Sequence, residues 1–133
     1  MRPGAALRSV RKICLWLAEA EERLSHGSPA FFVRQRQFVH YWNDHHGDGM
    51  HALWCAAPAG AQEMLVAADP ELFFVPPYVG FRGWIGLNLD RAEGVDDIAG
   101  AIENAYRTVA PPRLAGRSRA QRGGGGRTAV VGD

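Results

Sequence analysis

Three short apolar runs follow one another closely in the first half of the chain, and their spacing constrains the fold more than any other feature. They cover residues 31–33, 37–42 and 51–56. In the second run Phe38, His40 and Trp42 occupy every other position, an alternation that is typical of a half-buried strand. Short links join antiparallel strands, whereas parallel strands need long crossovers. The runs therefore predict an antiparallel meander, with Arg34-Gln35-Arg36 at the tip of its first hairpin.

Apolar residues spaced by three or four predict three amphipathic helices, over residues 5–20, from Pro58 to about 68, and over 95–110. Two further strand candidates, 73–75 and 84–89, lie between the second and third helices. The predicted order is α-β-β-β-α-β-β-α, an α+β fold in which an antiparallel sheet packs against helices. The stripe expected to be buried in the first helix contains Leu7, Val10, Cys14 and Leu17, with Leu24 alongside. The corresponding stripes are Ala61, Met64, Leu65 and Ala68 in the second helix and Ile98, Ile102, Ala105 and Val109 in the third.

The length of 133 residues and the 47% hydrophobic content suit one domain, which we place at residues 1–114. Residues 115–133 are expected to form a disordered Arg/Gly-rich tail, because they hold too little apolar area to offset the entropy of ordering. Five arginines and one aspartate give residues 113–133 a formal charge of +4, so the rest of the chain carries −3. A domain that coats nucleic acid is usually basic. Any affinity for polyanions must therefore come from a local patch or from the tail.

Several classes of protein are disfavoured by simple features of the chain. No apolar run approaches the ~18 residues of a membrane span. The apolar stretch at 13–18 is shorter than the ~7–15 residues of a signal peptide, and glutamates follow it. Two cysteines, Cys14 and Cys55, suit a reducing compartment better than a disulfide scaffold. We expect a cytoplasmic protein without a membrane partner.

One loop holds four potential metal ligands, His45, His46, Asp48 and His51. A metal site requires ligands that converge at about 2.0–2.2 Å, whereas neighbours in a loop tend to point apart. We therefore favour a solvated hairpin loop and expect no bound metal, with a metal site as the alternative. The chain also lacks a nucleophile motif, a phosphate-binding loop and a dinucleotide fingerprint. No cofactor and no enzymatic activity are expected.

Aromatic residues and arginines are interleaved after the Pro76-Pro77 pair, where Tyr78, Phe81, Arg82 and Trp84 follow. Arginines contact phosphates, and aromatic faces stack on bases. The alternative is that Phe81 and Trp84 belong to the core while the arginines solvate turns.

The stretch Asp69-Pro-Glu-Leu-Phe-Phe-Val-Pro-Pro-Tyr-Val-Gly-Phe-Arg-Gly-Trp-Ile-Gly-Leu-Asn-Leu-Asp90 resembles the MmcQ/YjbR family, and the resemblance extends over about residues 7–114. It implies a CyaY-like (frataxin-like) fold and a non-enzymatic protein named for DNA binding. Members often carry a lysine where this chain has Ala57. The candidate DNA-binding residues are Arg34, Arg36, Arg82 and Trp84, with weak binding of double-stranded DNA expected. A protein-interaction module that uses the 78–84 loop is the alternative.

Overall fold

The computed structural model describes residues 3–44 and 47–115. The elements are α1 (Pro3–Trp16), β1 (Ala20–Ser25), β2 (Ser28–Val33), β3 (Arg36–Asn43), β4 (His51–Cys55), α2 (Ala61–Ala68), β5 (Phe73–Phe74), the 3₁₀ turn η2 (Gly80–Arg82), β6 (Ile85–Asn88) and α3 (Val95–Val109). The order of helix, strands, helix, strands and helix confirms the predicted α+β class. His45, His46 and residues 116–133 of the predicted tail lie outside the described residues.

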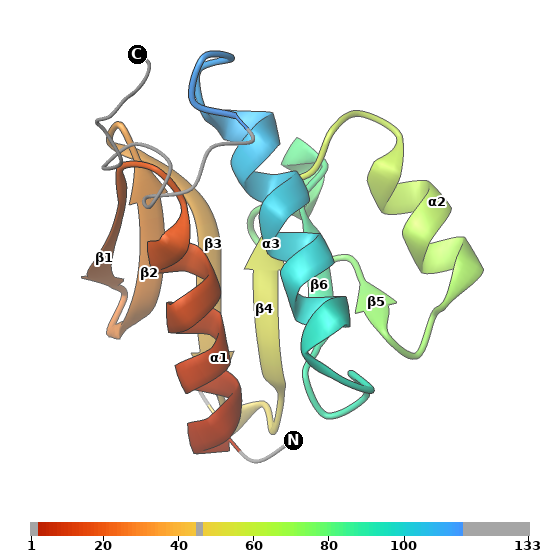
Figure 1. Ribbon diagram of the computed structural model, residues 1–133. Coiled ribbons are helices and arrows are strands. Elements are labelled where there is room, and N and C mark those ends of the chain that lie inside the picture. Colours follow the sequence, from red (N-terminus) through yellow and green to blue (C-terminus); the bar gives the residue numbers. More distant parts are fainter. Residues whose placement is uncertain (1–2, 45–46, 116–133) are drawn as a thin grey trace.

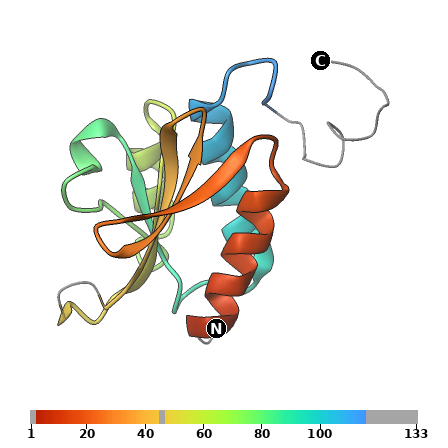
Figure 2. The same cartoon turned by 90° about the vertical axis from the view of Figure 1, so that its left-hand side faces the viewer.

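The strands form one sheet in the order β1-β2-β3-β4-β6-β5, and each neighbouring pair is antiparallel. Helices α1 and α3 cover one face of this sheet, and α2 lies at its edge beside β5 (Figure 1). The β1–β2 turn and the segment between β5 and β6 project from the opposite face (Figure 2). We call this second face, which none of the described α-helices covers, the open face.

The core lies between the sheet and the two covering helices. On α3, the predicted apolar residues Ile98, Ile102 and Ala105 are fully buried. The Tyr106 ring meets Phe38 of β3 edge-on, with 5.5 Å between ring centroids. The Tyr106 hydroxyl donates to the carbonyl oxygen of Ala18 at 2.7 Å. This hydrogen bond joins α3 to the segment that follows α1.

The predicted helix over 5–20 was too long, because α1 ends at Trp16 and Ala20–Ser25 forms the additional strand β1. Between them Glu19 has a φ of 62°, a left-handed conformation that usually requires glycine. The sequence consequently lacks the common signal for a helix end at this point. Leu24 lies on β1 and is 74% exposed rather than part of the helix stripe.

The second helix also differs from the prediction. It begins at Ala61, with Gly60 as its N-cap in the left-handed region, and not at Pro58. None of its residues is buried, and Met64 on the predicted apolar stripe is 66% exposed. This helix therefore stands at the sheet edge and contributes little to the core.

A β-bulge decides which side chains reach the open face. Phe31 pairs with Val39 but Phe32 pairs with Gln37, so Phe38 is an extra residue in β3. A bulge sets two residues of one strand against one of its partner and shifts the alternation beyond it. The prediction that Phe38, His40 and Trp42 share a face is therefore wrong. Phe38 packs against α3, whereas His40 and Trp42 lie on the open face.

No helix in the described part of the chain is long and apolar enough to cross a lipid bilayer.

Candidate nucleic-acid interface

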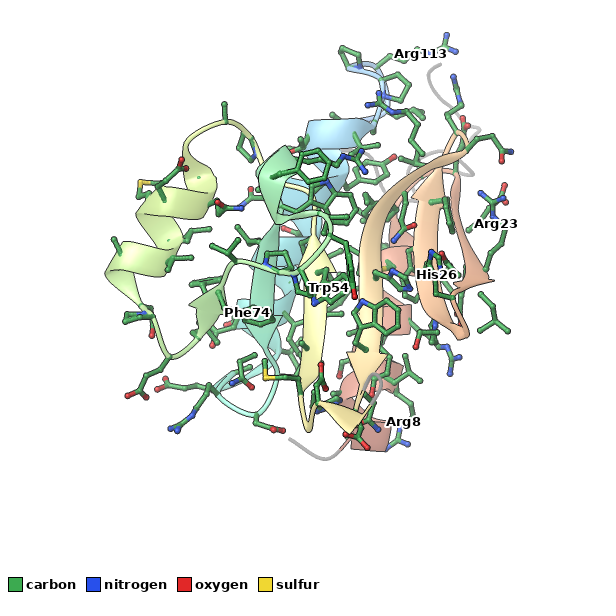
Figure 3. The ribbon with its side chains drawn as sticks, turned by 180° about the vertical axis from the view of Figure 1, so that it is seen from behind. Arg8, Arg23, His26, Trp54, Phe74 and Arg113 are labelled. Carbon is green, nitrogen blue, oxygen red and sulfur yellow. The ribbon has the colours of Figure 1, made fainter. Side chains whose placement is uncertain are left out.

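The open face carries a cavity of about 730 Å³, which we call the aromatic cavity. Its floor comes from β3 and β4, and its walls come from the β1–β2 turn and the 78–84 segment. Figure 3 looks onto this face, with Trp54 near the centre of the sheet and His26 to one side. The lining residues are Ser25, His26, Gln37, His40, Trp42, Trp54, Tyr78, Val79, Arg82 and Trp84.

The floor is a cluster of three rings. His40 and Trp54 are direct cross-strand partners, with 6.1 Å between their ring centroids. Trp42 lies against both, at 4.0 Å from His40 and 4.9 Å from Trp54. The three residues are only 4–6% exposed, so their rings support one another from below the cavity. Tilted and edge-to-face contacts of this kind are favourable between aromatic rings, and they give the cavity a rigid base.

The wall formed by the β1–β2 turn is fixed to this floor. Nε2 of His40 lies 2.9 Å from the carbonyl oxygen of Ser25. Because a carbonyl oxygen can only accept, Nε2 carries the proton and donates. The turn beyond Ser25 then brings His26 to the rim, where its ring centroid is 6.4 Å from that of His40.

A second cavity of about 490 Å³, the basic cavity, adjoins the first. The two cavities share Gln37, Val79, Arg82 and Trp84. Arg36, at the start of β3, lines the basic cavity together with Arg82, whose guanidinium carbon lies 5.5 Å from the centroid of the Trp84 ring. Among the described residues, no aspartate or glutamate lines either cavity. An anion that enters the basic cavity would meet two arginines and no carboxylate.

Gln62 of α2 holds the segment that carries Arg82. Its Nε2 donates to the carbonyl oxygens of Gly80, at 2.8 Å, and Trp84, at 2.6 Å. These two bonds fasten the first residue of η2, and the residue two positions after its end, to the edge helix. Sequence patterns could not have found Gln62, because its role depends on how α2 docks.

The structure brings together three of the four predicted site residues. Arg36, Arg82 and Trp84 line the basic cavity, whereas Arg34 lines neither cavity. Nε and Nη2 of Arg34 donate to the two carboxylate oxygens of Glu19, with 3.0 Å between Nη2 and Oε2. The hydrogen bond to this carboxylate raises the pKa of Arg34. Of the two residues offered as core, Trp84 is buried, but Phe81 is 88% exposed.

Sequence reasoning missed the aromatic cavity itself, which His26, His40, Trp42, Trp54 and Tyr78 line. An uncovered sheet face is normally polar, so tryptophans there are an unusual feature. The alternation in β3 was visible in the sequence. The bulge that turns His40 and Trp42 away from Phe38 was not.

His51, the described histidine of the predicted metal loop, is buried on the helix side of the sheet. A hydrogen bond of 2.8 Å joins its Nε2 to the Tyr41 hydroxyl, and its Nδ1 lies 3.5 Å from Oδ1 of Asp90. Within residues 3–44 and 47–115, no three histidine, cysteine or acidic side chains are grouped to hold a metal ion.

The family model described as YjbR matches residues 15–108. The chain belongs to the YjbR family. This finding confirms the resemblance seen in the sequence. The YjbR-family chain is also similar in structure to the Deinococcus radiodurans protein DR2400, a DUF419 domain known from a crystal structure. The TM-score is 0.67 at 17% identity, over 88% of this chain and 87% of the other.

This degree of likeness supports the fold. The CyaY-like arrangement and the domain boundary at 114 stay predictions. No curated protein matches the chain.

Proposed function

We propose that this YjbR-family protein is a non-enzymatic DNA-binding protein that uses the open face of its sheet. One observation carries the proposal. Arg36 and Arg82 come from separate segments of the chain and meet in one cavity beside Trp84, with no described carboxylate in the lining. This arrangement stands out in a chain whose charge outside residues 113–133 is −3.

The chemistry of the lining suits a nucleic acid. A guanidinium group forms paired hydrogen bonds with phosphate oxygens. Aromatic rings contribute stacking that does not depend on base identity. Two arginines neutralise few phosphates, so the expected affinity is in the non-specific range of ~10⁻⁴–10⁻⁶ M. The predicted contribution of Arg34 is left out, because Glu19 already binds its guanidinium.

The test must separate the folded surface from the basic tail. We would titrate labelled DNA at several salt concentrations with a full-length chain in which Arg117, Arg119, Arg122 and Arg127 are replaced by glutamine. This chain should still bind at low salt. Adding Arg36→Gln and Arg82→Gln should flatten the slope of log K against log salt by about 1.8 for duplex DNA, since each phosphate contact contributes about 0.9.

The matched control is Arg8→Gln, which removes an exposed cation from α1 behind the sheet (Figure 3). The slope of log K against log salt for this variant should equal that of the parent chain. The proposal fails if the chain with the substituted tail shows no binding at low salt, or if the double variant binds as its parent does.

A gain of cation offers an independent check. Ala57 is partly buried and lines the basic cavity, at the position where family members often carry lysine. Ala57→Lys would place a third cation beside Arg36 and Arg82. The salt slope should steepen by about 0.9. An unchanged slope would mean that phosphates do not reach this cavity.

A protein-interaction module is the second candidate, favoured by the exposure of three apolar side chains in one segment. Val75 is 55% exposed, Tyr78 77% and Phe81 88%. Exposed apolar patches often mark protein contacts. Substituting Phe81 separates the two functions, because this residue lines neither cavity. DNA binding should survive Phe81→Ser, whereas a contact made by the apolar segment should not.

A further inference from the structure

We infer that the aromatic cavity receives one unpaired nucleobase, so that the preferred DNA is single-stranded or carries an extruded base. This inference rests on the proposed DNA binding and specifies the class of DNA. It comes from the shape and chemistry of the cavity and from the backbone of Tyr78 at its rim.

The two walls of the cavity keep a base that is still paired away from the floor. The floor residues His40, Trp42 and Trp54 are 4–6% exposed and lie between two projecting walls. A paired base is stacked on both faces and offers a protein only its edge in a groove. To reach rings at the bottom of a recess, a base must leave the stack. The volume of about 730 Å³ falls within the ~300–1,000 Å³ typical of sites for small ligands.

The lining matches a flat group with polar edges. The tryptophan rings supply apolar surface, and the side chain of Gln37 has both a donor and an acceptor for the edge of a base. Arg82 belongs to both cavities. A nucleotide whose base lies among the rings can therefore place its phosphate at Arg82, and the next phosphate of the strand can reach Arg36. The two cavities together fit a segment of strand better than an isolated base.

Tyr78 adds an independent observation at the rim. Its φ is 68°, and the Val79 N–H donates to the carbonyl oxygen of Pro77 at 2.7 Å, which closes a three-residue turn around it. This form of turn is rare and strained. Strain of this kind is concentrated at functional sites. The turn holds the ring of Tyr78, which is 77% exposed, in the cavity wall.

The test compares three DNA ligands that carry similar phosphates, using the full-length chain with the four tail arginines replaced. They are a thymidine dodecamer, a dodecamer of abasic residues and a blunt hairpin duplex. Stacking of one base should make the thymidine strand bind roughly 5- to 150-fold more tightly than the abasic strand. The duplex should also bind more weakly than the thymidine strand.

The outcomes distinguish this inference from the function on which it rests. Equal binding of the thymidine and abasic strands overturns the inference but leaves DNA binding intact. If none of the DNA ligands binds, both the inference and the proposed DNA binding are overturned. Free thymidine monophosphate is a fourth ligand. If it binds as tightly as the dodecamer, the site is for a free nucleotide and the inference about a strand is wrong.

Two exposed residues of the same segment provide the matched variants. Tyr78→Ala should bring the thymidine strand close to the affinity of the abasic strand, without changing the abasic strand itself. Phe81→Ala, which removes a ring outside both cavities, should leave all affinities unchanged. A loss of base preference in both variants, or in neither, contradicts the assignment of Tyr78.

The tryptophans report directly on the cavity. Of the four in the chain, only Trp16 lies away from it, on α1. In a Trp16→Phe background, the thymidine strand should change the emission of the remaining tryptophans and the abasic strand should not. An equal change with both strands would show that the base does not reach the floor.

Discussion

Gln62 donates to the carbonyl oxygen of Trp84 at 2.6 Å, and so links the edge helix α2 to a segment that lines both cavities. The same amide nitrogen donates to the carbonyl oxygen of Gly80, the first residue of η2. None of the α2 residues is buried. The helix therefore acts as an anchor for η2 and the arginine that it presents, rather than as part of the core.

Replacing Gln62 with alanine should loosen this segment. The Trp84 carbonyl loses the Gln62 donor, which costs about 1–3 kcal/mol where water does not replace it, whereas the Gly80 carbonyl keeps its bond from the Gly83 N–H. Hydrogen exchange should accelerate at the amides of Arg82 and Gly83, which bond the carbonyls of Val79 and Gly80. The control is Glu63→Ala, a change at an exposed neighbour in the same helix. Equal exchange in the two variants would contradict the anchoring role.

Arg34→Gln should leave DNA affinity within about twofold of the parent, because its guanidinium is bound by Glu19. Arg36→Gln, two residues along the same hairpin, should weaken binding and flatten the salt slope by about 0.9. Both residues are exposed and both substitutions remove one positive charge. The pair therefore separates a local contact from a change in net charge. Equal losses in the two variants would show that only the overall charge matters.

Much of the fold follows from local patterns. The α3 stripe was predicted because Ile98, Ile102 and Ala105 repeat at helical spacing, and all three are buried. The end of α1 could not be predicted. Glu19 turns the chain with a φ of 62°, and the ion pair with Arg34 holds it from a distant hairpin. A contact between residues 15 positions apart in the sequence cannot be recognised from a local pattern.

Part of the candidate site could likewise be predicted from the sequence, and part could not. The local sequence was enough to select Arg36, Arg82 and Trp84, since arginines beside aromatic rings are suited to phosphates and bases. The aromatic cavity required the bulge at Phe38, which places His40 and Trp42 on the open face. Bulges depend on the pairing of two strands and not on the sequence of one. The aromatic cavity, the larger of the two, could therefore not be predicted from the sequence.

Gly86→Ala should destabilise the protein and disturb β5. Gly86 pairs with Phe74 across the sheet edge, and a Cβ atom there would lie 2.4 Å from the Phe74 ring. Overpacking of this kind costs about 1–3 kcal/mol, because a ring or a strand must move. Urea unfolding should show the loss. Gly100→Ala, on the exposed side of α3 with nothing near the added methyl group, should be neutral or stabilising.

If Phe74 is the obstacle, its removal should rescue the variant. Phe74→Leu combined with Gly86→Ala should be less destabilised than the sum of the two single changes, because they share one contact. Strict additivity would contradict this explanation.

Finally, the two cysteines should be inert in the folded protein and should make its stability depend on alkaline pH. Burial raises the pKa of the Cys55 thiol from 9.0 to about 12, and burial also raises the pKa of Cys14 well above its ordinary value. At pH 8, iodoacetamide should alkylate both thiols in urea and neither in the folded state. Above pH 9 the unfolded thiols lose protons that the folded state keeps, so unfolding becomes more favourable. Stability should fall by about 1.4 kcal/mol per pH unit for each thiol until the folded thiols ionise. Cys55→Ala should remove its share of this slope, and an unchanged slope would show that other groups cause it.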